Sequence, residues 1–275
     1  RHFKKRNETI KGVQVKRCGI ISRKDSALRL FLNYISFVIT ASFKVLTGKR
    51  DYDVVYCYQL SPVTQAIPAI LAAKLAGCRL MLYCLDIFPE SVKSHVSENS
   101  FVYRMVAKLS KFIYNKCDKI AVTSPAFAEY LARVNSVPAE SVVYIPQHSR
   151  KIELAKSAVA AKNGKTNYLF AGNIGYGQNM SVVVKAVAEL RDLDNFLVHI
   201  VGDGSKLAEM QDEVKANGVE DKFVFYGRKP KEQMPEYYRL ADVLLITLRG
   251  DNEVANTLPG KMQEYMSVGK PIVGS

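Results

Sequence analysis

A short run near the C-terminal end of the sequence has residue types that could hold a nucleotide. The run LPGKMQEYMSVGKPIV (258–273) opens with a Pro-Gly turn, continues through good helix formers to a break at Gly269, and ends in a β-branched strand. Glu264 falls in the first half of the predicted helix, near its positively polarised N-terminus, and the preceding loop can offer backbone N–H groups to an anion. A carboxylate that accepts two hydroxyl hydrogen bonds beside such amides suits a ribose diphosphate, although any αβ unit can show this pattern.

A second candidate site is the glycine-rich loop GNIGYGQN (172–179), which follows the strand-like residues 167–171 and precedes a predicted helix. Glycines in that position let the backbone approach a phosphate and direct its amides at it. The spacing matches neither a Walker loop nor the dinucleotide fingerprint, so the loop alone indicates anion binding and no particular ligand.

A third candidate site lies where the apolar strand 79–85 ends in DIFPES (86–91). Ligands of open α/β sheets bind beyond the carboxyl ends of the strands, so Asp86 and Glu90 are placed for chemistry. Asp86 could orient or deprotonate a hydroxyl group, and His95 could follow it into the cleft. The alternatives are that Asp86 and Ser91 only cap and turn the chain and that His95 is incidental.

These three motifs, which follow one another along the chain as DxxPES, the GNIG loop and PGKxxEYM, resemble those of the retaining glycosyltransferases of family 4, which have the GT-B fold. PGKxxEYMxxGKPIV and DxxPES are similar to the branch that builds bacterial capsule, exopolysaccharide and O-antigen repeat units. In the family signature a glutamate, seven residues and a second glutamate precede the turn and strand. Glu264 matches the second glutamate, which grips the ribose diol, and Asn256 stands where the first would contact the sugar.

The resemblance also implies where the donor diphosphate would lie. The family's glycine loop sits beneath the diphosphate and carries an Arg followed by a Lys, which this sequence lacks, so neutralisation falls to the amides, Lys261 or Arg228. Electrostatic stabilisation of the departing diphosphate would then carry most of the rate. We expect Asp86, Glu90 and Lys261 to be catalytic. We expect the donor to be bound by Gly172, Asn173, Gly175, Gln178, Arg228, Asn256, Thr257, Gly260 and Glu264.

The reaction implied by the resemblance is transfer of a hexose-type sugar from a nucleotide diphosphate donor, with UDP favoured, to a hydroxyl of a lipid-linked acceptor. The anomeric configuration would be retained, and neither a metal ion nor a cofactor would be needed. A D-x-D triplet at 51–53 precedes a strand and is not interpreted as a metal site. A nucleotide-sugar 2-epimerase of the same fold and a non-catalytic nucleotide-binding, membrane-associated protein remain alternatives.

The alternation of strand and helix patterns predicts an α/β protein, and the resemblance implies two Rossmann-like parallel-sheet domains that face each other across a cleft. We expect an acceptor-side domain over 1–148, a polar linker over 149–166 and a nucleotide-sugar-binding domain over 167–275. Both domains are expected to be incomplete, because the chain opens on a charged segment and stops directly after a predicted strand.

The net charge of +13 is concentrated at one end of the chain. Residues 1–50 hold 13 Lys or Arg against 2 acids, whereas 151–275 are neutral. Such a patch suits nucleic acid, an anionic lipid surface or a polyphosphorylated substrate, and no motif of a nucleic-acid-binding module accompanies it. Five scattered cysteines without C-x-x-C spacing argue against zinc or disulfide frameworks and fit a reducing cytosol. We therefore expect a cytoplasmic protein, peripheral at the inner face of the cell membrane.

Two predicted helices belong to this basic half. The apolar segment 28–46 has only 14 uncharged residues between Arg29 and Lys44, short of the roughly 20 that span a bilayer. We expect a helix buried against a sheet, or alternatively one that also dips a face into the membrane interface. The segment 101–116 predicts an amphipathic helix with basic residues on one face.

Overall fold

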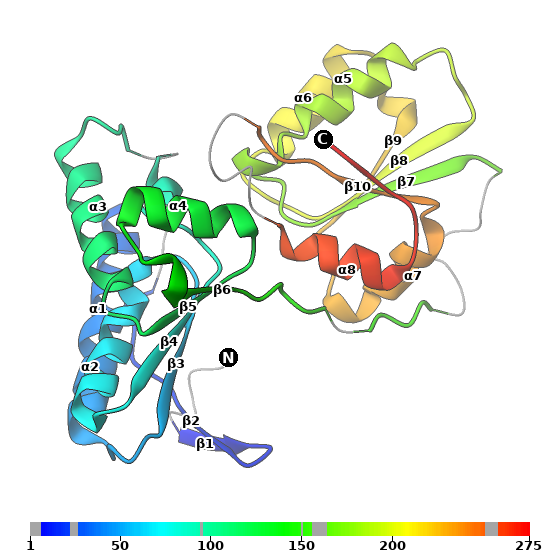
Figure 1. Cartoon of the computed structure of the whole chain (residues 1–275). Coiled ribbons are helices and arrows are strands. Elements are labelled where there is room, and N and C mark those ends of the chain that lie inside the picture. The colour runs from blue at the N-terminus through cyan, green and yellow to red at the C-terminus, as the bar shows by residue number, and fades with distance from the viewer. Residues whose placement is uncertain (1–6, 23–26, 94–95, 150, 156–163, 251–257) are drawn as a thin grey trace. The chain divides into compact units, whose positions relative to one another are not determined.

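The computed structural model describes residues 7–22, 27–93, 96–149, 151–155, 164–250 and 258–275. The chain divides into two compact units, Arg1–Pro146 and Gln147–Ser275 (Figure 1). Each unit is built around its own parallel sheet. The predicted fold class, two Rossmann-like α/β domains, is confirmed.

The first unit, called unit 1, has a four-stranded parallel sheet in the order β3-β4-β5-β6. Its apolar strands alternate between the two faces of the sheet, and Leu80, Leu82 and Cys84 of β4 enter a core that is closed by the helices. The strands are β3 (Val54–Gln59), β4 (Arg79–Cys84), β5 (Lys119–Val122) and β6 (Val142–Tyr144). The helices are α1 (Ala27–Thr47), α2 (Ala66–Ala76), α3 (Phe101–Tyr114) and α4 (Pro125–Asn135).

A hairpin of β1 (Asn7–Ile10) and β2 (Val13–Lys16) precedes α1. The two strands pair with each other antiparallel and form a separate two-stranded sheet. Helix α1 packs on α2, and its outer side is exposed. The expectation that this helix is buried against a sheet is therefore wrong, because α2 is the helix that covers β3 and β4.

The second unit, called unit 2, has a five-stranded parallel sheet in the order β11-β10-β7-β8-β9. One apolar core lies between the sheet and α5 and α6, and a second lies between the sheet and α7 and α8. The strands are β7 (Thr166–Ala171), β8 (Phe196–Val201), β9 (Phe223–Gly227), β10 (Val243–Ile246) and β11 (Ile272–Gly274). The helices are α5 (Ser181–Glu189), α6 (Leu207–Ala216), α7 (Met234–Leu240) and α8 (Gly260–Val268).

The strand order of unit 2 fixes where a ligand can bind. From the central strand β7 the chain builds the sheet outward through β8 and β9, then returns to the other side of β7 with β10 and β11. The neighbouring strands β7 and β10 therefore lead to helices on opposite faces, α5 and α8. Such a switch point at the carboxyl ends of the strands is where open α/β sheets bind ligands.

Unit 2 also contains a buried histidine, His199 of β8, which is 3% exposed. Its Nε2 lies 2.9 Å from Oδ1 of Asn167 and its Nδ1 lies 3.0 Å from the hydroxyl of Tyr226. Burial lowers the pKa of His199 from its ordinary value of 6.5, and this effect outweighs the attraction of nearby Asp242. The folded state therefore keeps this ring neutral.

We predict that unit 2 loses stability as the pH falls below about 6.5, because the unfolded chain then binds a proton that the folded His199 resists. The free energy of unfolding should fall by at most about 1.4 kcal/mol per pH unit from this residue. Urea denaturation at pH 7.5 and 5.5 measures the difference. His199→Gln should reduce this pH dependence; an equal dependence in both proteins would contradict the assignment.

Candidate functional site

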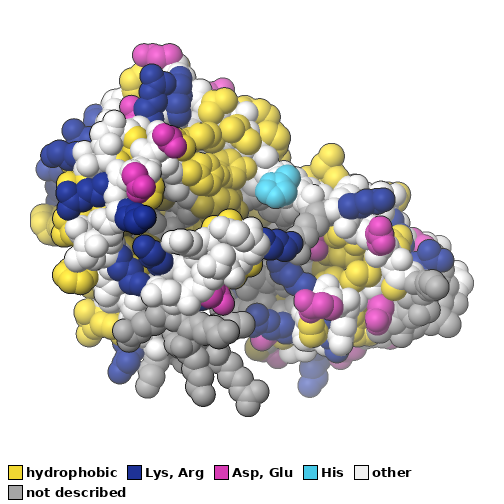
Figure 2. Space-filling view, turned by 90° about the horizontal axis from the view of Figure 1, so that it is seen from below, with side chains coloured by type: hydrophobic (Ala, Val, Ile, Leu, Met, Phe, Trp, Pro, Cys, Tyr) yellow, Lys and Arg dark blue, Asp and Glu magenta, His cyan; other side chains and the backbone are white. Residues whose placement is uncertain are grey.

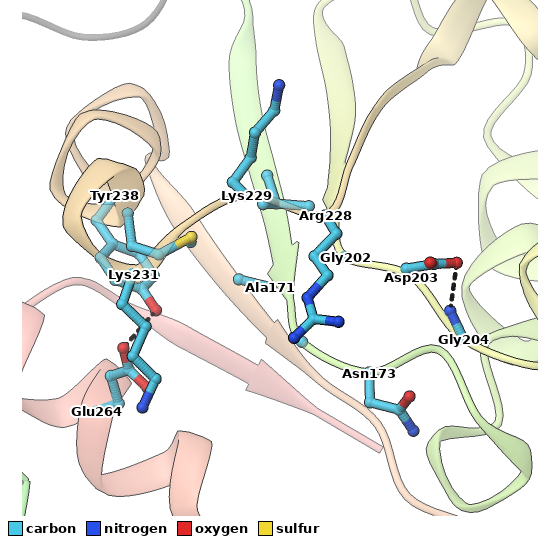
Figure 3. A pocket seen from close by; sticks show the side chains of 13 residues that line it. Ala171, Asn173, Gly202, Asp203, Gly204, Arg228, Lys229, Lys231, Tyr238 and Glu264 are labelled. Atoms are coloured by element: carbon cyan, nitrogen blue, oxygen red, sulfur yellow. Dashed lines mark hydrogen bonds between the residues drawn. The ribbon is translucent and has the colours of Figure 1, made fainter. Parts of the chain in front are cut away.

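A cavity of about 580 Å³ opens at the carboxyl ends of β7, β8 and β9, and all of its lining residues belong to unit 2 (Figure 3). They come from the loops after these three strands and from α7 and α8. The lining residues are Ala171, Gly172, Asn173, Val201, Gly202, Asp203, Gly204, Arg228, Lys229, Lys231, Met234, Tyr238 and Glu264.

The floor of the cavity is formed by two backbone segments that cross in contact. The N–H of Gly172 donates to the carbonyl of Val201 at 2.9 Å. Gly202 has a φ of +153°, and a Cβ on it would lie 1.8 Å from the carbonyl oxygen of Gly172. A Cβ on Gly204 would similarly lie 2.3 Å from the oxygen of Ile174. Only glycine permits this crossing, so the floor is bare backbone that a ligand can approach closely.

Glu264 stands on one wall of the cavity, and its carboxylate is held by a tyrosine. The hydroxyl of Tyr238, a residue of α7 that is 2% exposed, donates to Oε1 of Glu264 at 3.0 Å. Burial and the neighbouring Glu264 raise the pKa of Tyr238, which keeps the hydroxyl protonated as a donor. Glu264 is the fifth residue of α8 and lies beyond its first turn, so the expected help from the helix dipole is small.

The next residue, Tyr265, anchors α8 to the sheet. Its side chain is fully buried, and its hydroxyl accepts from the N–H of Ala171 at 2.8 Å and donates to the carbonyl of the same residue at 3.2 Å. Ala171 is the last residue of β7, directly before the glycine loop. This double contact sets the height of Glu264 above the cavity floor.

Lys261, in the first turn of α8, directs its ammonium group at the glycine loop. Its Nζ lies 4.0 Å from the centre of the Phe170 ring, and a Cβ on Gly172 would lie 3.1 Å from it. Nζ is buried, and no hydrogen-bond partner for it is found among the described residues. Burial lowers the pKa of Lys261 to about 8. A buried ammonium without an oxygen partner is costly, and an anion over Gly172 would satisfy it.

More positive charge lines the cavity after β9. Arg228, expected from the sequence, is accompanied by Lys229 and Lys231, which the sequence analysis did not single out. Figure 3 shows the guanidinium of Arg228 reaching toward Asn173, across the cavity from Glu264. The K-P-K run directly after Arg228 is basic and follows a predicted strand, so the sequence could have indicated these two lysines as further anion-binding residues.

The remaining residues that were predicted to bind the donor nucleotide are not among the described residues that line the cavity. Gln178 accepts from the N–H of Gly175 at 3.2 Å and from Nδ2 of Asn173 at 3.5 Å, so its side chain shapes the loop. Gly260 is the first residue of α8. Asn256, Thr257 and His95 lie outside the described residues.

In unit 1, the two predicted acids have different environments. The carboxylate of Asp86 accepts from the hydroxyl of Ser91, and burial raises its pKa. That hydrogen bond is what the turn-forming alternative requires, while the raised pKa suits a proton acceptor. Glu90 is 6% exposed, accepts from Tyr130 at 2.9 Å and forms an ion pair with Lys93 at 2.6 Å, so its carboxylate is engaged in local packing. Their catalytic roles remain predictions.

Within the part of the chain that is described, no group of three or more His, Cys, Asp or Glu side chains is arranged to hold a metal ion. The five cysteines are free thiols. The groups that line the cavity are backbone amides, ammonium and guanidinium groups and carboxylates.

Two family models match the chain almost from end to end. Residues 4–148 match the glycosyl transferase 4-like domain and residues 151–275 match glycosyl transferases group 1. The probable glycosyltransferase WbjE of Pseudomonas aeruginosa is 24% identical over 92% of this chain and 64% of its own length. The amylovoran biosynthesis glycosyltransferase AmsD of Erwinia amylovora is 26% identical over 67% of this chain and 49% of its own length. The chain thus spans less than two thirds of either relative.

Solved structures show the same fold. Anabaena Alr3699/HepE in complex with UDP-glucose has a TM-score of 0.67 at 15% identity, covering 91% of this chain and 65% of that one. Sucrose-phosphate synthase from Thermosynechococcus elongatus has a TM-score of 0.68 at 17% identity, covering 99% and 68%.

We predict that Gly202→Ala disrupts the site and destabilises unit 2 by about 3 to 5 kcal/mol, through strain and the clash with the Gly172 carbonyl. Gly218→Ala is the matched control, because Gly218 also has a positive φ but open space around its Cβ position. It should cost only about 1 to 2 kcal/mol. Urea denaturation compares the two; equal losses would show that the crossing is not required.

Proposed function

Because the chain belongs to the GT-B glycosyltransferases, with a glycosyl transferase 4-like domain followed by a group 1 domain, we propose that it transfers a hexose-type sugar from a UDP-sugar. The acceptor is a hydroxyl of a lipid-linked molecule, the anomeric configuration is retained, and no metal ion takes part. The product is a building block of a bacterial surface polysaccharide. The names of AmsD and of the HepE complex with UDP-glucose support this proposal.

One observation carries the proposal: a tyrosine-held carboxylate and an amide floor line the same cavity. One oxygen of Glu264 accepts a hydrogen bond from Tyr238, but a carboxylate has about four acceptor sites. The remaining sites accept both hydroxyls of the ribose. The diphosphate then extends over Gly172 and Gly202, where no side chain blocks its approach.

Lys261 gives the leaving diphosphate its counter-charge. In the free protein its buried ammonium lies over the Phe170 ring and has no hydrogen-bond acceptor among the described residues. A phosphate oxygen above Gly172 supplies the missing acceptor, and negative charge that grows on the diphosphate during the reaction strengthens that bond. Arg228 and the lysines after it complete the neutralisation from the other side. Asp86 orients or deprotonates the acceptor hydroxyl.

Turnover separates this proposal from its alternatives. The full-length protein is incubated with labelled UDP-sugars and a lipid-linked acceptor, and the products are separated. Transfer of label to the lipid with retained configuration supports the proposal. Release of a free epimer would indicate a 2-epimerase, and tight UDP binding without turnover would indicate a non-catalytic binding protein; either result would overturn it.

We predict that Glu264→Ala weakens the binding of UDP by about 1 to 3 kcal/mol, because the charged hydrogen bonds to the ribose are lost. Uridine should lose the same amount, since the ribose is common to both ligands. Calorimetry measures both affinities. The control is Glu189→Ala at the exposed end of α5, outside the cavity. Unchanged affinity in Glu264→Ala would remove this carboxylate from the site.

We predict that UDP binding weakens as the pH rises through about 8, because Lys261 then loses its proton. Above that pH the affinity should fall by up to about tenfold per pH unit. The second ionisation of a phosphate lies near pH 6, so the charge of the diphosphate is constant above pH 8. Lys261→Met should bind UDP weakly and without this decline, whereas uridine should be insensitive to pH in both proteins. A decline that persists in Lys261→Met would assign it to another group.

A further inference from the structure

Helix α1 carries a continuous row of exposed apolar side chains along its outer side. They recur at intervals of three or four residues, which places them on one face of the helix. The row consists of Leu28, Phe31, Ile35, Ile39, Phe43 and Leu46. Ile39 and Phe43 are 61% and 65% exposed, so the row is open to solvent along its length.

The other sides of α1 are held by unit 1. The helix packs against α2, and its polar residues bond to the segment before it. The carbonyl of Ile21 accepts from Asn33 Nδ2 at 2.5 Å, and the carbonyl of Gly19 accepts from the hydroxyl of Thr40 at 2.8 Å. By length and composition Leu28–Leu46 could cross a bilayer. Its packing and hydrogen bonds instead suit a helix that lies along the surface of unit 1.

Helix α3 adds a second exposed surface of the same composition. Phe101, Met105 and Phe112 are each more than half exposed, and Arg104, Lys108 and Lys111 lie among them. Both helices pack on α2 and lie on the helical side of the unit 1 sheet (Figure 1). Neither contains an acidic residue. Figure 2, a view from below, shows Lys and Arg side chains interspersed with hydrophobic ones and a few acidic ones over unit 1.

We infer that α1 and α3 together form a surface that docks onto an anionic phospholipid bilayer, with α1 lying in the plane of the interface. The apolar row enters the boundary between headgroups and acyl chains, and the cations meet the lipid phosphates. Isologous pairing with a second copy suits this surface poorly, because it would bring two pairs of basic helices without acidic residues together. The inference adds a membrane contact to the proposed function, whose acceptor is lipid-linked, and it requires no step of the transfer reaction.

The sequence offers a direct test because it contains no tryptophan. Phe43→Trp places a single fluorophore in the apolar row, and Leu193→Trp places one on the exposed surface of unit 2 as the control. The full-length protein is mixed with phosphatidylglycerol vesicles or phosphatidylcholine vesicles that carry bromine at shallow or deep acyl positions. We expect a blue shift and shallow-bromine quenching for Phe43→Trp on the anionic vesicles, and no change for Leu193→Trp.

Three results would overturn the inference. The first is no quenching of Phe43→Trp by either bromine position. The second is strongest quenching by the deep bromines, which would indicate a helix that spans the bilayer. The third is a blue shift that grows with protein concentration in the absence of vesicles, which would indicate contact with a second copy. As a second variant, Ile39→Asp with Phe43→Asp should lower vesicle partitioning at least tenfold, and Leu190→Asp in unit 2 should leave it unchanged. UDP binding is measured on the same proteins. Quenching without UDP affinity would sustain the docking surface and count against the transferase proposal alone.

Discussion

The cavity in unit 2 depends on the crossing of two backbone segments at a separation that excludes a Cβ atom. Gly202 sits against the carbonyl of Gly172, and the hydrogen bond from Gly172 to Val201 fixes that position. The absence of a side chain on Gly172 leaves room for the ammonium of Lys261. Two glycines in contact therefore determine the bare floor and the place of the buried charge beside it.

Helix α8 couples this floor to the wall of the cavity through adjacent residues that point in different directions. Tyr265 bonds both backbone groups of Ala171, so the helix cannot shift without breaking a buried pair of hydrogen bonds. Glu264 faces the cavity and is oriented by Tyr238. The carboxylate thus has a fixed partner before any ligand binds, whereas the ammonium of Lys261 has none among the described residues. Under the proposed function, the ribose meets a prearranged group and the diphosphate relieves an unsatisfied one.

The sequence predicted the parts of this site that depend on local pattern. Strand and helix periodicity placed the glycine loop after β7 and Glu264 on α8, and the two-domain α/β class followed. Contacts between distant segments were not predictable: Tyr238 lies 26 residues from Glu264, and no spacing rule links them. The helix dipole was the only local explanation for holding Glu264, and the structure gives a tertiary one. Helix α1 was expected to be buried because it is strongly apolar. Composition alone does not show which of two apolar helices packs on the sheet, and in the structure that helix is α2.

The cations of α1 and α3 and the buried Lys261 respond to different solution conditions. Arg29 of α1 and the three cations of α3 are exposed, so their attraction to an anionic surface is screened by salt over a Debye length of about 8 to 10 Å. Lys261 is buried, so salt reaches it poorly, but the same burial brings its pKa to about 8 and makes its charge depend on pH. Under the two proposals, salt would govern how long the protein stays at the bilayer and pH would govern how well it holds a nucleotide. Varying pH and salt in turn would therefore separate the contribution of Lys261 from that of the solvated cations, which include Arg228 at the same cavity.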